Sequence, residues 1–174
     1  MVFLNARNNS QGFTLLETMI TIIVIGILSA IAAPSFLAML NKNRVNSALS
    51  DIQGALQQAQ REAMRKSISC KVNLNNNTIT SDSSNSSNCL VTGNRTLPDG
   101  VVMVTNISGT PPQIEFSYRG TIILPDAGTI VLSSNDNPNY KKCLVISSPL
   151  GIIRTGNYNA STTSSITYDK CKKN

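Results

Sequence analysis

The stretch Gln11-Gly12-Phe13-Thr14-Leu15-Leu16-Glu17, continued by an almost unbroken apolar run to Ala33, decides the fold of this chain. The 21 residues from Phe13 to Ala33 are apolar except for three threonines, one serine and Glu17. As a helix rising ~1.5 Å per residue, this segment spans about 30 Å, the thickness of the hydrocarbon core of a bilayer. The segment therefore predicts a membrane-spanning helix.

A secretory signal peptide is the alternative interpretation of the same stretch. Arg7 would be its basic region, Met19–Leu28 its apolar core and Ala30-Ile31-Ala32 its cleavage site. Glu17 argues against this interpretation, because an ionised carboxylate in lipid costs roughly 2–3 kcal/mol and is normally retained for a partner. A discarded peptide has no use for such a group.

The segment from Gln11 to Glu17 resembles the cleavage signature of type IV pilins and of the pseudopilins of type II secretion systems. The resemblance implies that a prepilin peptidase cuts after Gly12 and that the new terminal residue, Phe13, is methylated. It also implies that Glu17 pairs with the amine of a neighbouring subunit during assembly. Pro34 stands where pilin helices commonly carry a proline, and a proline inside a helix kinks or locally melts it.

The composition points away from an enzyme. The chain has 174 residues and 18.7 kDa, 41% of its residues are hydrophobic and only 14% are charged, and it contains neither His nor Trp. The lack of histidine excludes His-dependent catalysis and removes the commonest metal ligand. We therefore expect no catalytic residues, no cofactor and no metal site.

Beyond Pro34 an apolar stripe continues at helical spacing, through Val45, Leu49, Ile52, Leu56, Ala59 and Ala63. From Ile68 onward, short β-segments alternate with turn residues. The expected strands are Ser69–Leu74, Thr78–Thr80, Val101–Ile107, Ile114–Tyr118, Thr121–Leu124, Thr129–Leu132 and Lys142–Ser147, with possible edge strands at Ile152–Thr155 and Ser165–Tyr168. A Ser/Asn-rich loop covers residues 81–88.

This layout is an α+β fold, a long N-terminal helix packed on an antiparallel β-rich domain. It resembles the GspH/FimT type of minor pilins and pseudopilins, on three segments: Gln58–Ala63, Phe116–Gly120 and the late pair Gly151 and Arg154. The expected organisation is a leader peptide over residues 1–12, a membrane and assembly helix over 13–34, an amphipathic helix over 35–66 and a β-rich domain over 67–174.

Four cysteines without a C-x-x-C spacing indicate two disulfides and folding outside the reducing cytoplasm. Four cysteines allow three connectivities. We expect the sequential one, which joins Cys70 to Cys89 and Cys143 to Cys171 and would tether the C-terminal segment to the sheet.

The net charge of +6 is concentrated at the C-terminus, since residues 141–174 alone sum to +5. In the FimT-like branch a C-terminal Gly-Arg-x-Arg motif binds DNA, and here Gly151-Ile152-Ile153-Arg154 lacks the first arginine. Tyr140, Tyr158 and Tyr168 are candidates for stacking on bases. The candidate DNA-binding residues are Lys141, Lys142, Gly151, Arg154, Lys170, Lys172 and Lys173; the alternative is a solvated surface or a contact between subunits.

The resemblance implies a minor pilin or pseudopilin that initiates or decorates a type IV pilus, with Gly12 and Phe13 for processing and Glu17 and Pro34 for assembly. Two alternatives remain open, a DNA-binding minor pilin for DNA uptake and a pseudopilin serving protein export. The expected partners are other pilin subunits, the prepilin peptidase, the inner membrane (crossed once before assembly) and possibly DNA. The expected location is the inner membrane, with the β-rich domain outside the cytoplasm, and then the pilus or pseudopilus.

Overall fold

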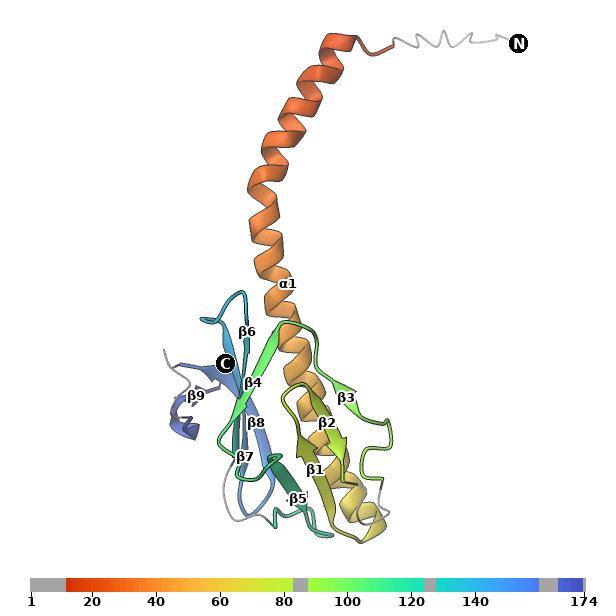
Figure 1. Cartoon of the computed structure of the whole chain (residues 1–174), viewed down its shortest axis with the longest axis vertical. Helices are drawn as coiled ribbons and strands as arrows, with labels where there is room; N and C mark the ends of the chain where they lie inside the picture. The colour runs from red at the N-terminus through yellow and green to blue at the C-terminus, as the bar shows by residue number, and fades with distance from the viewer. Residues whose placement is uncertain (1–11, 83–87, 124–127, 160–165, 174) are drawn as a thin grey trace, which may run out of the picture. The chain divides into compact units, whose positions relative to one another are not determined.

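The computed structural model describes residues 12–82, 88–123, 128–159 and 166–173 (Figure 1). The expected leader peptide (apart from Gly12), Arg7, Leu124, Ser165 and most of the Ser/Asn-rich loop lie outside the described residues. One long helix, α1 (Leu15–Lys66), is followed by short antiparallel strands. The chain divides into two compact units, residues 1–38 and residues 39–174.

In the first unit, α1 begins with a side-chain cap and runs through its apolar stretch with every large side chain exposed. The hydroxyl oxygen of Thr14 accepts a hydrogen bond from the backbone N–H of Glu17 at 3.3 Å, as an N-cap residue does. The hydroxyls of Thr18 and Thr21 each donate to the carbonyl three residues earlier, at 2.8 Å. These polar side chains are thus compatible with an apolar helix. The helix is continuous through Pro34 in this structure.

The second unit consists of the remainder of α1 and two antiparallel sheets, labelled in Figure 1. The first sheet has the order β3-β2-β1-β5 and the second has the order β4-β6-β7-β8-β9. The strands of the first sheet are β1 (Cys70–Leu74), β2 (Thr78–Ser81), β3 (Arg95–Thr96) and β5 (Gln113–Phe116). The strands of the second are β4 (Val101–Thr105), β6 (Gly128–Ser134), β7 (Lys141–Ser147), β8 (Ile152–Tyr158) and β9 (Cys171–Lys172).

One apolar core joins the helix to both sheets. The expected stripe is confirmed, with Leu49 partly buried and the other members fully buried. Ala48 and Ala55 are buried as well, which widens the buried face of α1 so that it contacts both sheets. Phe116 of β5 and Leu144 of β7 are among the core residues that the two sheets supply.

Three strand predictions need correction. The expected edge strand at Ile152 is the interior strand β8, which pairs with β7 on one side and β9 on the other. Near Thr121, the described residues contain only an isolated bridge between Ile122 and Phe116, because the chain turns again toward the β7–β8 connection. The segment expected to form a strand up to Tyr168 instead leads into a 3-10 helix (Tyr168–Lys170), and the edge strand is β9.

The structure contains both expected disulfides, Cys70–Cys89 and Cys143–Cys171. The first lies in the main core beside α1. The second joins β7 to the edge strand β9 and belongs to a smaller cluster with Val131 and Tyr158, on the sheet face turned away from the main core. The C-terminal strand is therefore held both by backbone pairing and by a covalent link.

Candidate functional sites

The side-chain amide of Gln60 connects two loops distant in sequence. Its Nε2 donates to the carbonyl oxygen of Gly120 at 2.8 Å and to that of Gly151 at 3.2 Å. Gln60, Gly120 and Gly151 come from the three segments on which the GspH/FimT resemblance rests. The structure thus brings these segments together around one amide, and the sequence pattern did not reveal this contact.

Gly151 has a structural explanation that is independent of nucleic acid. It ends the turn between β7 and β8 with φ +68°, a conformation that side-chain-bearing residues rarely adopt. A Cβ at this position would lie 2.7 Å from the carbonyl oxygen of Gly120 and 2.9 Å from Nε2 of Gln60. Both the turn and the close approach of Gln60 therefore require glycine.

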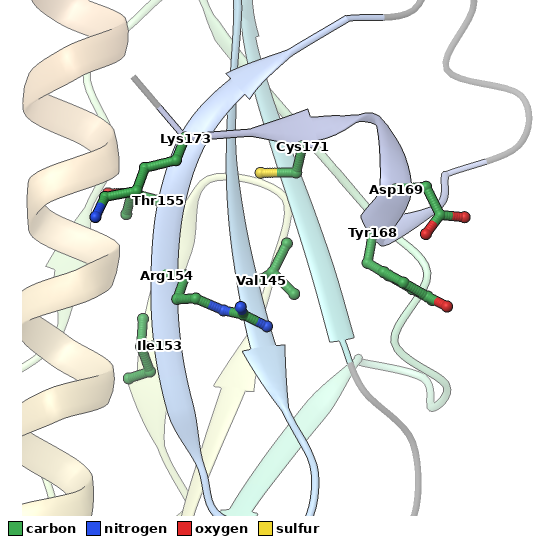
Figure 2. A pocket seen from close by; sticks show the side chains of 8 residues that line it. All are labelled: Val145, Ile153, Arg154, Thr155, Tyr168, Asp169, Cys171 and Lys173. Carbon is green, nitrogen blue, oxygen red and sulfur yellow. The ribbon is translucent and has the colours of Figure 1, made fainter.

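Arg154 borders a hollow of about 600 Å³ on one face of the second sheet. It stands opposite Val145 in the register of β7 and β8, while the neighbouring Ile153 packs against the main core. Because successive side chains of a strand point to opposite faces, Arg154 lies on the face turned away from α1. Its guanidinium donates to the hydroxyl of Ser147 at 3.0 Å. Figure 2 shows it lying across Val145, with Tyr168 and Asp169 on the other side of the hollow.

Lys142 belongs to the opposite face of the same sheet. Lys142 lies two residues before Leu144 on β7, so the two side chains point to the same face of the sheet, and Leu144 packs in the main core on the α1 side. Its Nζ donates to Oδ1 of Asn157 at 2.6 Å and lies 5.6 Å from the centroid of the Tyr140 ring. Lys173 lines a second hollow together with Lys142 and, in Figure 2, runs beside Thr155 on the side nearest α1.

The candidate DNA-binding residues therefore do not form one surface. Arg154 and Lys142 lie on opposite faces of the sheet, and Lys173 lines the hollow beside each of them. Lys141 is half-buried, Lys170 belongs to the short 3-10 helix and Lys172 to the edge strand β9. Of the tyrosines considered for stacking, Tyr158 is only 4% exposed and is unsuitable, whereas Tyr168 is well exposed.

Asp169 borders the same hollow as Arg154 and Lys173, so an acidic residue is placed among the basic ones there. An arginine with an acidic neighbour attracts a polyanion less than an isolated one does. In the described part of the chain, no three His, Cys, Asp or Glu residues lie close enough together to hold a metal ion.

Lys42 and Asn46 of α1 are functional candidates that sequence reasoning missed. The Nζ of Lys42 lies 5.7 Å from the centroid of the Tyr140 ring, and the Tyr140 hydroxyl donates to Oδ1 of Asn46 at 3.0 Å. In the sequence, the only signal for Lys42 and Asn46 was their position off the apolar stripe of the helix. Only the tertiary packing places these two residues beside the C-terminal lysines.

Two family descriptions match the sequence. The Prokaryotic N-terminal methylation motif covers residues 7–33, and Type II transport protein GspH covers residues 48–151. The second match spans more than half of the chain, so the chain belongs to the GspH family. No curated protein sequence matches the chain.

Two crystal forms of one solved protein share the fold, and a third solved structure matches with a lower score. The type IV minor pilin FimU of Pseudomonas aeruginosa, in one crystal form, has a TM-score of 0.54 at 16% identity over 67% of this chain and 90% of that chain. A second crystal form of FimU has a TM-score of 0.51 at 16% identity, and the match covers 63% of this chain and 90% of that chain. The minor pseudopilin EpsH of the Vibrio cholerae type 2 secretion system has a TM-score of 0.48 at 16% identity, and the match covers 64% of this chain and 94% of that chain.

The classification is consistent with the architecture of a pilin, one long helix packed on antiparallel sheets. The chain is a pilin-like subunit of the type IV pilus or type II secretion class. Within the described residues, α1 is long and apolar enough near its N-terminus to cross a membrane.

Proposed function

We propose that this chain is a minor filament subunit, cleaved after Gly12, methylated on Phe13 and assembled through the first part of α1. The observation that carries the proposal is Glu17. It is an acidic side chain within an exposed apolar helix, and in the described part of the chain no basic group pairs with it. The cap from Thr14 involves the backbone N–H of Glu17 and leaves the carboxylate available.

An ionised carboxylate in an apolar environment needs a compensating charge. The amine at Phe13 of a neighbouring processed subunit supplies such a charge. The first part of α1 then packs among other helices in the filament, which removes its apolar side chains from lipid and water alike. Before assembly the same segment anchors the subunit in the inner membrane as a single span, with the β-rich domain outside the cytoplasm.

The proposal is tested by Glu17→Gln in the full-length precursor, which removes the charge and keeps the shape. We expect normal cleavage between Gly12 and Phe13, seen by mass spectrometry, together with a strong loss of incorporation into sheared filaments. Thr21→Ala, one turn further along α1, is the matched control and should be incorporated normally. Normal incorporation of the Glu17→Gln protein would contradict the pairing.

DNA binding is a second candidate function, favoured by the concentration of positive charge in residues 141–174. The test is polarisation binding of labelled duplex DNA to the full-length protein in detergent, across a salt series. Contacts to four phosphates predict a slope of log K against log salt of about −3.6. Binding that is weakened by Arg154→Ala would support this function, and no binding at low salt would exclude it.

Protein export through a type II secretion system is the other alternative, since it uses the same assembly chemistry. Deleting the gene in its host separates the two uses. Loss of pili with normal secretion supports the pilus, and loss of secretion with normal pili supports export.

A further inference from the structure

Tyr140 lies between two lysines that come from distant parts of the chain. The Nζ of Lys42, on α1, is 5.7 Å from the centroid of its ring, and the Nζ of Lys142, on β7, is 5.6 Å from it. The Tyr140 hydroxyl is held by Asn46 at 3.0 Å, and Lys142 is held by Asn157 at 2.6 Å. The ring and at least one of the ammonium groups are thus positioned by hydrogen bonds.

A small hollow of about 250 Å³ adjoins this arrangement, lined by Leu49, Lys142, Thr155, Gly156 and Lys173. It lies between α1 and the edge of the second sheet, as its members show. Lys42, Tyr140, Lys142 and Lys173 are called the tyrosine–lysine cluster below. The volume of this hollow suits a single lipid headgroup rather than an extended polymer.

Among the described residues, no acidic side chain forms an ion pair with the lysines of the cluster. In the ranges that the structure describes, none of its three lysines lies within 4.0 Å of a carboxylate oxygen. Other basic residues of this unit do: Lys71 lies between Asp82 and Glu115, and Arg95 lies beside Asp51. Because like charges repel, Lys42 and Lys142 on the Tyr140 ring, with Lys173 lining the adjoining hollow, favour a bound anion.

The position of Lys42 in the chain indicates the source of that anion. Lys42 follows Leu40, the last large residue of the exposed apolar segment, by two positions, and two residues reach at most about 7 Å. Lys42 therefore stays close to the bilayer surface whenever that segment is in the membrane. Lysine and tyrosine side chains are suited to this region, where one part of each is apolar and the other polar.

We propose that the tyrosine–lysine cluster binds the phosphate group of an anionic phospholipid while the subunit is anchored in the membrane. This inference rests on the membrane stage of the proposed function. Clustered basic residues next to a membrane span attract anionic lipids, each contributing about a fivefold gain in affinity. Duplex DNA fits the cluster less well, because Lys142 is half-buried on the helix-facing side and Arg154 lies on the opposite face of the sheet.

The test uses the full-length protein in detergent micelles that contain equal amounts of phosphatidylglycerol and phosphatidylcholine. Native mass spectrometry measures the ratio of the two lipid adducts. We expect phosphatidylglycerol to be preferred, and the preference to fall at least about fivefold in the variant Lys42→Gln/Lys142→Gln. The variant Lys42→Arg/Lys142→Arg keeps the charge and should keep the preference.

The matched control is Arg61→Gln/Arg119→Gln, which removes two exposed positive charges elsewhere on the same unit. Equal losses in the control and in the lysine variant would overturn the proposal, since they would indicate net charge alone. Displacement of the lipid by an excess of inorganic phosphate would overturn the lipid assignment in favour of the free ion. Displacement by a short DNA duplex would overturn it in favour of nucleic acid.

Insertion is measured separately, by resistance of the protein to alkaline extraction from pure phosphatidylcholine vesicles. Failure to insert would contradict the membrane stage of the proposed function. Insertion without any preference for phosphatidylglycerol would overturn the lipid site alone.

Discussion

The side-chain amide of Gln60 donates to the carbonyl oxygen of Gly120, 60 residues away in the sequence, at 2.8 Å. Its second bond, to Gly151, extends the connection to the β7–β8 turn. One helical side chain thus holds two loops against α1, one that follows β5 of the first sheet and one that joins β7 to β8 of the second.

Replacing Gln60 by Leu should lower the free energy of unfolding by about 1–3 kcal/mol, because two partly buried carbonyl groups lose their donor. Urea unfolding of the full-length protein, followed by tyrosine fluorescence, measures the change. Gln57→Leu is the matched control, since Gln57 lies one turn earlier and makes none of these bonds. Equal losses in the two variants would show that the bridge contributes nothing specific.

Gly151→Ala should be more destabilising than Gly93→Ala. Both glycines have a positive φ, +68° and +85°, so both substitutions incur the left-handed penalty of about 1–2 kcal/mol. Only at Gly151 would the added Cβ meet other atoms, 2.7 Å from the Gly120 carbonyl oxygen, whereas the space at Gly93 is open. The difference between the two midpoints of urea unfolding measures the steric contribution, and no difference would contradict the close approach.

The two disulfides close loops of similar length, with sequence separations of 19 and 28, so chain entropy predicts a loss of about 3 kcal/mol for either one. We expect Cys70→Ala/Cys89→Ala to cost more than Cys143→Ala/Cys171→Ala. The first pair is fully buried in the main core, and its removal also leaves a cavity.

Thermal unfolding of the two double variants checks this order, with the oxidised wild-type protein as the reference. Non-reducing peptide mapping checks the pairing itself. A peptide joining Cys70 to Cys143 would contradict both the connectivity and the expected order.

The hydrogen bonds from Arg65 lower the pKa of Glu62 from its ordinary value of 4.5, and the positive charges of Arg65 and Lys66 act in the same direction. A carboxylate with a lowered pKa in the folded state stabilises the fold above its ordinary pKa, and this stabilisation is lost as the pH falls through the lowered value. The melting temperature of wild type should therefore exceed that of Glu62→Gln slightly at neutral pH and converge with it in acid.

Arg65→Gln should give a smaller difference, because Glu62 keeps its ion pair with Lys66, and the double variant should match Glu62→Gln alone. A difference in melting temperature between wild type and variant that grows on acidification would contradict the expected sign. Thermal melts at several pH values in constant salt provide the measurement.

Much of the fold followed from the sequence because the signals were local. The 3.6-residue spacing of apolar side chains predicted the buried face of α1, and turn residues placed most of the strand boundaries within one or two positions. The errors occurred where pairing partners decide the outcome. The sequence predicts an edge strand at β8, because nothing in its composition shows that β9, only two residues long, covers its far side.

The sequence by itself determined the class of this protein, because the methylation motif, the apolar helix and the amphipathic stripe are contiguous patterns of residues. Only the tertiary structure decided which basic residues act together. Alternation along β7 and β8 turns Lys142 toward α1 and Arg154 away from it, and the packing of α1 brings Lys42 to Tyr140. Charge along a chain is visible in the sequence, but the face on which each charge lies depends on strand register and on the elements packed against it.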